Sequence, residues 1–291
     1  MPRVAVRQSP MCASAPAATS RIAIIAGAGR FPFHVAREGK RQGCQVIVLG
    51  LQGWADASLA GQVDAYEEVA VGELGRLIER LKSHEVRRVI MAGKVTKEIL
   101  LRDRPAFDAA ARAVVQRAPD ASVNRLLGEI AALLAQEGIT LLDSSTFLRD
   151  ALCPSGAVTA RVPTPGETSD IDVGFRAARA MAALDIGQTV VVKHRVVIAV
   201  EALEGTDAAI QRAHALVGCG LVVVKAASPS QDRRFDLPVI GLETIATLVQ
   251  AGVSCLAVQA HVTLLLDRDA LVERANASNL CLVGVAPPAD A

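Results

Sequence analysis

Aromatic side chains are scarce in this chain. Its 291 residues include six phenylalanines, one tyrosine and one tryptophan, which is 3% in all, while hydrophobic residues together reach 51%. The core must therefore be built from aliphatic and alanine side chains. The formal net charge is +1, and no basic cluster is interleaved with aromatic residues. The sequence thus gives no reason to expect a nucleic-acid partner.

Long apolar runs and paired cysteines are also missing. Lys, Arg, Asp or Gly interrupts every apolar run before it reaches the length of a membrane span. The six cysteines are scattered without a CxxC pair, so most are expected to be buried, reduced thiols of a cytoplasmic protein. No histidine pair has zinc-site spacing. Residues 1–20 lack a continuous apolar segment and are expected to form a disordered extension.

The order of apolar segments predicts an α/β fold with two domains, and the chain is long enough for both. Residues 21–152 alternate short apolar strands with helices, which is typical of a Rossmann-like domain with a mostly parallel sheet. Residues 153–168 are rich in proline and glycine and are predicted to be a linker. Residues 169–291 are predicted to form a mixed α/β domain, with a helix starting near Ser169 and a hairpin around His194.

The first predicted turn lies between an apolar strand and a helix. It contains Gly27, Gly29 and Arg30, but Pro32 replaces the third glycine of a dinucleotide fingerprint. No acidic residue follows the next strand, so the pattern does not favour an NAD site. Backbone NH groups at the helix start, with Arg30 beside them, could hold an anion, although a purely structural turn explains the same residues.

A second candidate lies at the end of the apolar strand 88–92. Gly93, Lys94 and Thr96 follow this strand, at the edge where open α/β sheets bind their ligands. This position makes Lys94 a candidate for a phosphate or substrate contact, and an ordinary surface lysine is the alternative.

Polar residues also gather where a predicted strand leads into a helix. Glu201, Glu204, Thr206 and Asp207 occupy this junction. Helix capping by Thr206 or Asp207 explains the pattern without any ligand, so both interpretations stay open.

The most informative stretch is residues 221–241. An apolar strand leads to Lys225, and a charged loop with Asp232, Arg234 and Asp236 follows. Cations that could grip phosphate thus lie near carboxylates that could hold Mg²⁺ or orient a water, although a solvated loop has a similar composition. Asp236 argues against the solvated loop, because it stands among apolar residues where a carboxylate is costly unless it is paired, protonated or metal-bound.

The run Gln-Asp-Arg-Arg-Phe-Asp-Leu-Pro-Val-Ile-Gly, residues 231–241, resembles the signature of the LpxI-type UDP-2,3-diacylglucosamine pyrophosphatases of lipid A synthesis. The likeness covers nearly all of residues 21–285. Its matching stretches are 25–32, 72–75, 91–95, 184–188, 201–207, 231–241 and 266–268. Each stretch alone is a weak signal, but their combination in this order is specific.

The resemblance implies a two-domain enzyme that hydrolyses UDP-2,3-diacylglucosamine to 2,3-diacylglucosamine 1-phosphate (lipid X) and UMP. It implies a divalent cation, Mg²⁺ or Mn²⁺, and a lipid chamber between the domains. The catalytic aspartate of the family falls on Asp236, as metal ligand or general base. Asp232 is then a candidate second ligand, and Lys225, Arg234 and Lys94 are candidate charge stabilisers. The expected substrate contacts are Gly27, Gly29, Arg30, Gly72, Gly75, Gly93, Lys94, Thr96, Thr206, Asp207, Gln231 and Thr244.

Two positions depart from the family pattern. Relatives carry a lysine where this chain has Ser228, and an acidic pair where it has Val123 and Asn124. The serine gives some support to an alternative, a catalytically silent protein that still binds a UDP-sugar or lipid-sugar. A dinucleotide-dependent oxidoreductase is the third alternative. The substrate implied by the resemblance is compatible with peripheral contact with the inner membrane, and the sequence leaves a homo-oligomer open.

Overall fold

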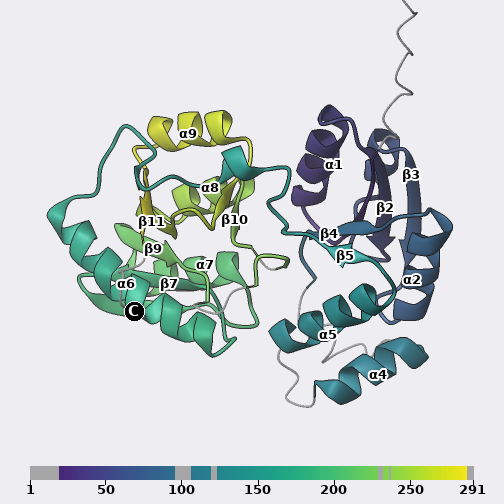
Figure 1. Ribbon diagram of the computed structural model, residues 1–291. Coiled ribbons are helices and arrows are strands. Elements are labelled where there is room, and N and C mark those ends of the chain that lie inside the picture. Colours follow the sequence, from purple (N-terminus) through teal and green to yellow (C-terminus); the bar gives the residue numbers. More distant parts are fainter. Residues whose placement is uncertain (1–19, 96–105, 119–122, 229–231, 236, 287–291) are drawn as a thin grey trace, which may run out of the picture.

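The computed structural model describes residues 20–95, 106–118, 123–228, 232–235 and 237–286 (Figure 1). These residues form two α/β domains, each built on its own sheet. The predicted fold class, a Rossmann-like parallel sheet followed by a mixed α/β domain, is therefore confirmed. Most of the extension predicted at residues 1–20 lies outside the described residues.

The N-terminal sheet has five parallel strands in the order β3-β2-β1-β4-β5. Its strands are β1 (Arg21–Ala26), β2 (Gln45–Leu51), β3 (Ala65–Val69), β4 (Arg88–Ala92) and β5 (Thr140–Leu141). The segments that cover it are α1 (Phe31–Arg41), η1 (Ala57–Gln62), α2 (Leu74–Ser83), α4 (Ala109–Arg117) and α5 (Val123–Gln136). The strand order reverses between β1 and β4, and such a switch point is where open α/β sheets bind ligands.

A parallel sheet must be covered on both faces, and this one has a separate apolar cluster on each. One cluster joins the strands to α2, α4 and α5, and the other joins them to α1. Five of the six residues of β1 are buried, as expected for a central strand of such a sheet.

The C-terminal sheet is mixed and has six strands in the order β6-β13-β11-β9-β7-β8. Its strands are β6 (Gly156–Ala157), β7 (Thr189–Lys193), β8 (Val196–Val200), β9 (Leu221–Lys225), β11 (Val253–Gln259) and β13 (Cys281–Val285). The remaining elements are η2 (Arg149–Ala151), α6 (Pro165–Ala183), α7 (Thr206–Val217), β10 (Val239–Ile240), α8 (Leu242–Gln250), β12 (Leu264–Leu265) and α9 (Arg268–Ala277). The predicted hairpin is confirmed, because β7 and β8 pair antiparallel around His194 and Arg195, which both have positive φ.

The start of α6 differs from the prediction. The helix begins at Pro165 rather than near Ser169, and Thr164 is its N-cap. Glu167 completes a capping box with Thr164, which fixes the helix start more strongly than a lone serine can. The segment 153–168, expected to be a linker, thus holds the first turn of α6, and also β6, which pairs with β13.

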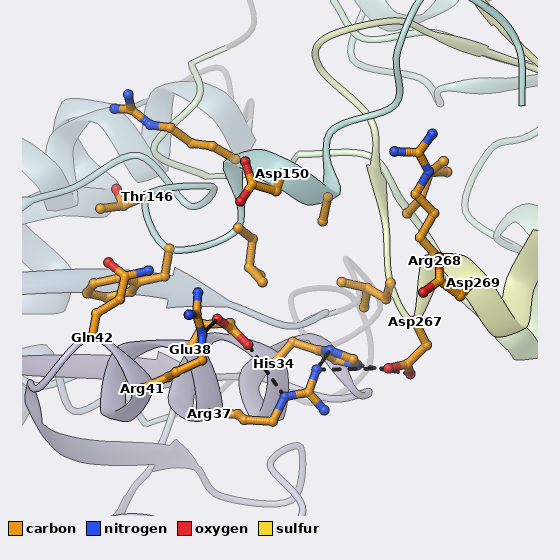
Figure 2. Close-up of a pocket in the computed structure, with 16 residues that line it drawn as sticks. His34, Arg37, Glu38, Arg41, Gln42, Thr146, Asp150, Asp267, Arg268 and Asp269 are labelled. Carbon is orange, nitrogen blue, oxygen red and sulfur yellow. Dashed lines mark hydrogen bonds and ion pairs between the residues drawn. The ribbon is translucent and has the colours of Figure 1, made fainter.

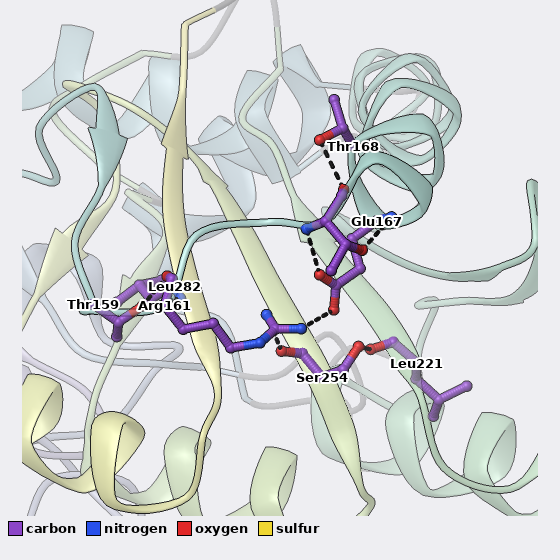
Figure 3. Close-up of polar contacts among 8 residues, drawn as sticks. Thr159, Arg161, Glu167, Thr168, Leu221, Ser254 and Leu282 are labelled. Carbon is purple, nitrogen blue, oxygen red and sulfur yellow. Dashed lines mark hydrogen bonds and ion pairs between the residues drawn. The ribbon is translucent and has the colours of Figure 1, made fainter.

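Glu167 also anchors Arg161, as Figure 3 shows: the guanidinium lies 2.6 Å from the carboxylate, and the backbone NH of Thr164 donates to the same group. Burial raises the pKa of Glu167, but these hydrogen bonds outweigh it and lower the pKa to about 2. Because the pKa in the folded state lies below the ordinary 4.5, the carboxylate stabilises the fold above that pH and loses its contribution as the pH falls toward 2.

We therefore expect Glu167→Gln to lower the free energy of unfolding by about 3 kcal/mol at neutral pH. Urea denaturation at pH 7 and again near pH 3 measures this difference, which should shrink at the lower pH. The exposed Glu273, changed to Gln, is the matched control and should have little effect at either pH. An equal loss for Glu167→Gln at both pH values would contradict the interpretation.

Two expectations from the composition can be compared with the described residues. Cys153, Cys255 and Cys281 are buried free thiols, as predicted, whereas Cys44 is partly buried and Cys219 is exposed. Within the described ranges, no helix combines the length and the apolar character needed to cross a bilayer.

Candidate functional site

The predicted glycine turn and the end of β4 lie against each other at the switch point of the N-terminal sheet. Ala28 and Lys94 exchange two backbone hydrogen bonds, each 2.9 Å long. A Cβ atom on Gly27 would lie 2.7 Å from the carbonyl oxygen of Lys94, so only glycine permits this approach. Gly93 has a φ of +97° and is equally close to Gly27. The structure thus brings Gly27, Gly93 and Lys94, which the sequence offered as two separate candidates, together at the carboxyl edge of the sheet.

Arg30 and Gly29 complete this turn. Arg30 is the N-cap residue of α1, and its guanidinium lies 4.4 Å from the centre of the Phe33 ring. No side chain caps the helix, but Pro32 has no NH group, and the NH groups of Phe33 and His34 donate to the carbonyl of Arg30. The turn therefore offers an anion the NH of Phe31 and the exposed Arg30. Gly29 has a φ of +92°, which favours glycine at this point of the turn.

In the C-terminal domain, the structure excludes helix capping as the explanation for the polar residues at the start of α7. Gly205 is the N-cap residue, and neither Thr206 nor Asp207 caps the helix. The hydroxyl of Thr206 instead donates to Glu201 at 2.7 Å and accepts from the ammonium group of Lys225 at 3.2 Å. The same ammonium group lies 3.3 Å from the hydroxyl of Thr189. Asp207 is exposed in the first turn, where a negative charge is favourable.

Glu201 is the residue whose role the sequence did not reveal. Burial raises the pKa of its carboxyl. Lys225 and the hydroxyls of Thr189 and Thr206 lower this pKa by more than burial raises it, so the pKa lies below its ordinary value. Glu201 is therefore ionised and holds the positive charge of Lys225 beside Thr206. The only sequence signal was its place at the end of an apolar strand, close to Thr206.

We expect Glu201→Gln to lower the free energy of unfolding by roughly 2–3 kcal/mol, because Lys225 then loses its counter-charge in a partly buried setting. Glu204→Gln is the matched control. Glu204 lies on the same loop but pairs with the exposed Arg212, so its loss should cost under about 1 kcal/mol. Urea denaturation measures the unfolding free energy of the two variants. Equal losses would mean that the buried contacts of Glu201 stabilise the protein no more than the exposed ion pair of Glu204.

The two domains meet at this network. The ammonium group of Lys94 lies 3.3 Å from the position that a Cβ atom on Gly205 would occupy. Two lysines from different domains thus approach the start of α7, Lys94 from one side and Lys225 through Thr206. Lys94 forms no ion pair with any residue that the structure describes. The positive end of a helix and two cations form a suitable setting for a phosphate group.

The charged loop that follows β9 docks on the N-terminal domain. The hydroxyl of Ser144 contacts the carbonyl oxygens of both Met91 and Arg234, at 3.0 and 2.8 Å, and its NH donates to the carbonyl of Arg233. Met91 lies in β4, close to the position of Lys94. Arg233 and Arg234 therefore reach the same edge of the N-terminal sheet as the glycine turn.

Two apolar side chains hold this loop in place. Phe235 is 3% exposed and joins the apolar cluster under α2, α4 and α5, while Leu237 is 7% exposed and joins the cluster under α1. The two residues thus insert into the cores on opposite faces of the N-terminal sheet. Asp236, the residue between them, lies outside the described residues.

Asp232 and Arg234 pair with each other, with a shortest distance of 2.6 Å, and Arg234 holds the pKa of Asp232 below its ordinary value. Arg233 pairs with Asp143 at 3.1 Å. Among the residues that the structure describes, no three acidic, histidine or cysteine side chains form a metal-binding group. Mg²⁺ bound to a diphosphate needs only one or two protein carboxylates. The metal role predicted for Asp232 and Asp236 therefore stays a prediction.

The remaining predicted contacts are dispersed. Gly72 and Gly75 lie before and within the first turn of α2, where the NH of Gly75 donates to Asp108 at 2.7 Å. Thr244 lies in the first turn of α8. Thr96 and Gln231 fall outside the described residues. Ligand contacts at these positions stay predictions.

A pocket of about 580 Å³ lies elsewhere between the domains, bounded by α1, residues 146–151 and the start of α9 (Figure 2). His34 accepts from Arg37 through Nδ1 and faces the Asp267 carboxylate at 3.3 Å through Nε2. Arginine can only donate, so the imidazole is neutral and donates to Asp267, which agrees with a pKa of His34 lowered by burial. None of the predicted site residues lines this pocket, so it is a domain contact distinct from the candidate site.

Comparison with known proteins gives the family. One family model, the LpxI N-terminal domain, matches residues 21–151, and a second, the LpxI C-terminal domain, matches residues 154–283. The chain belongs to the LpxI family. A curated family member, the UDP-2,3-diacylglucosamine pyrophosphatase LpxI of Caulobacter vibrioides, is 31% identical to it over 280 residues, which is 92% of this chain and 98% of that protein. The resemblance predicted from the sequence motifs is confirmed.

Two solved structures resemble this LpxI-family chain only weakly. A UDP-glucose 4-epimerase from Stenotrophomonas maltophila is 14% identical, with a TM-score of 0.28 over 41% of this chain and 34% of its own. The biotin carboxylase domain of a thermophilic 2-oxoglutarate carboxylase is 11% identical, with a TM-score of 0.26 over 59% of this chain and 34% of its own. Scores this low carry no argument about function.

Proposed function

We propose that this LpxI-family protein hydrolyses the diphosphate of UDP-2,3-diacylglucosamine, giving 2,3-diacylglucosamine 1-phosphate and UMP for lipid A biosynthesis. The observation that carries the proposal is the match of both LpxI domains, together with the Caulobacter relative that bears this activity in its name. The arrangement of Lys94, Lys225 and the start of α7 supports it, because a diphosphate needs several cationic and NH donors.

In the proposed reaction, Lys94 and Lys225 bind the diphosphate from opposite domains, and Arg234 offsets the charge that develops on its oxygens. Asp236 takes a proton from the attacking water. The water oxygen bonds to the sugar-side phosphorus, the bond from that phosphorus to the bridging oxygen breaks, and UMP leaves. A divalent cation, Mg²⁺ or Mn²⁺, held by Asp236 and Asp232 together with the diphosphate, would neutralise charge in this site.

The direct test is to incubate the purified protein with UDP-2,3-diacylglucosamine and Mg²⁺ or Mn²⁺ and to follow UMP. Running the reaction in ¹⁸O-labelled water locates the attack, since the label should enter the lipid phosphate and not UMP. Tight binding of the lipid product without UMP release under either metal would instead favour the silent binding protein. Ser228 is 7% exposed and stands where the resemblance to the family predicts a lysine, which is the feature that favours this second function.

A further inference from the structure

Residues 232–235 of the charged loop form a closed turn, called here the arginine turn. The carbonyl of Asp232 accepts a hydrogen bond from the NH of Phe235 at 3.2 Å, and its carboxylate accepts one from the NH of Arg234 at 3.0 Å. The same carboxylate binds the guanidinium of Arg234, whose central carbon lies 5.9 Å from the centre of the Phe235 ring. The guanidinium is thus fixed relative to its own backbone, so a rotation of the turn would carry its charge along.

The pairing with Asp232 leaves part of the Arg234 side chain available to a ligand. A guanidinium carries N–H donors on three nitrogens, and the carboxylate of Asp232 contacts Nε and Nη2. The other terminal nitrogen lies outside this pairing, and the side chain is 42% exposed. Arg234 can therefore contact a phosphate oxygen while Asp232 holds it in place.

Ser144 attaches the arginine turn to the N-terminal sheet. It is 1% exposed, its NH donates to the carbonyl of Arg233 at 2.9 Å, and its hydroxyl lies 2.8 Å from the carbonyl oxygen of Arg234. The hydroxyl also lies 3.0 Å from the carbonyl oxygen of Met91 in β4. Because a hydroxyl has a single hydrogen, it is shared between two carbonyl oxygens that would otherwise lie around a buried position without a donor.

The turn that follows β5 leaves Ser144 free to bond across the domain boundary. The carboxylate of Asp143 accepts from the NH and the hydroxyl of Ser145, at 2.7 and 2.5 Å, and the carbonyl of Asp143 accepts from the NH of Thr146 at 3.0 Å. Asp143 also pairs with Arg233, but both side chains are partly exposed, so this ion pair is weak. The buried contacts of Ser144 therefore contribute more to the orientation of the arginine turn.

The two lysines of the candidate site are held by other groups. The backbone at Lys94 is fixed by the two hydrogen bonds that it exchanges with Ala28, and the ammonium group of Lys225 contacts the hydroxyl of Thr206. A change at Ser144 should therefore disturb the arginine turn and leave both lysines in place.

From these contacts we propose that Ser144 is a positioning residue that acts through Arg234. Its hydroxyl fixes the arginine turn so that the guanidinium meets the diphosphate where charge develops. The inference rests on the proposed function, in which Arg234 stabilises that charge. It predicts a loss of rate rather than of substrate binding, because the lysines that bind the diphosphate stay in place. A displacement of about 1 Å in such a group lowers a rate on the order of a hundredfold.

The test measures kcat and KM for UMP release by the full chain, from detergent-dispersed UDP-2,3-diacylglucosamine with Mg²⁺ and with Mn²⁺. Ser144→Ala should lower kcat roughly 10- to 100-fold and change KM less than about threefold. Ser145→Ala is the matched control, since Ser145 is equally buried at 1% exposure and its hydroxyl bonds within its own turn. The control should keep kcat within about twofold of the wild type.

A double-mutant cycle shows whether Ser144 acts through Arg234. Arg234→Gln removes the guanidinium, so adding Ser144→Ala to that variant should lower kcat by less than about threefold further. A residue that only maintained the fold would cause the same loss in both backgrounds. Urea denaturation of every variant gives the fraction of folded protein in the assay, so that unfolding is not counted as a loss of rate.

Three results would overturn the role of Ser144 alone. They are a wild-type kcat in Ser144→Ala, an equal loss of kcat with and without the Arg234 guanidinium, and a rise in KM as the main change. A wild type that releases no UMP with either metal would instead overturn the proposed function, and this inference with it. The two failures are therefore distinguishable.

Discussion

Replacing Asp236 with alanine should lower the rate of UMP release about a thousandfold or more, the largest effect expected of any single change in this protein. A carboxylate that receives the proton of the attacking water, or that holds a metal on the diphosphate, contributes an effect of this size. The measurement is the initial rate of UMP release at saturating substrate, with Mg²⁺ and with Mn²⁺.

Two further variants make the Asp236 result specific. Asp236→Asn keeps the size of the side chain and removes its charge, so it should be nearly as inactive as the alanine variant. Asp172→Asn makes the same chemical change on the exposed side of α6 and should leave the rate unaltered. If Asp236→Asn kept more than about half of the wild-type rate, the assigned role would be wrong even though the family is right.

Phe235→Ala should cost about 3–5 kcal/mol of unfolding free energy, because it empties a site that is 3% exposed and packed into the core of the other domain. The charged loop would then lose one of its two apolar anchors, so UMP release should fall as well. Urea denaturation measures the first effect, and the hydrolysis assay at low temperature, where the variant is still folded, measures the second.

Phe235→Leu is the matched control, since it retains an apolar side chain and should cost less than about 1.5 kcal/mol. A Phe235→Ala variant within about 1 kcal/mol of the wild type would mean that the side chain does not anchor the loop in solution. If Phe235→Ala were clearly destabilised but released UMP at the wild-type rate, anchoring of the loop by Phe235 would not be needed for hydrolysis.

Local sequence signals predicted the strands and turns well. Strand β4, residues 88–92, was predicted at its observed ends, and the turn at His194 was predicted between β7 and β8. These predictions succeeded because buried strands need continuous apolar runs and turns need polar residues. The start of α6 was missed although Thr164 and Glu167 have capping-box spacing, because the prolines of that segment suggested a linker instead.

Contacts between distant segments could not be predicted in the same way. The sequence marked residues 231–241 as chemically important and the glycine turn as a candidate site, but it did not show that Ser144 joins the charged loop to β4. Nor did it show that Thr206 contacts Glu201 and Lys225 instead of capping α7. Such contacts depend on how the two sheets are placed relative to each other, and residue periodicity along one segment carries no information about that placement.

The anchoring of Phe235, Leu237 and β12 across the domain boundary also affects synthesis of the protein. The cluster under α1 contains Ile22 and Phe31 from the beginning of the chain together with Leu237, Leu264 and Leu266 from near its end. A ribosome that has translated only the first half has made a sheet with one incompletely covered face. Its exposed apolar surface favours aggregation until the last of these leucines emerges, so the order of translation delays completion of the earlier domain.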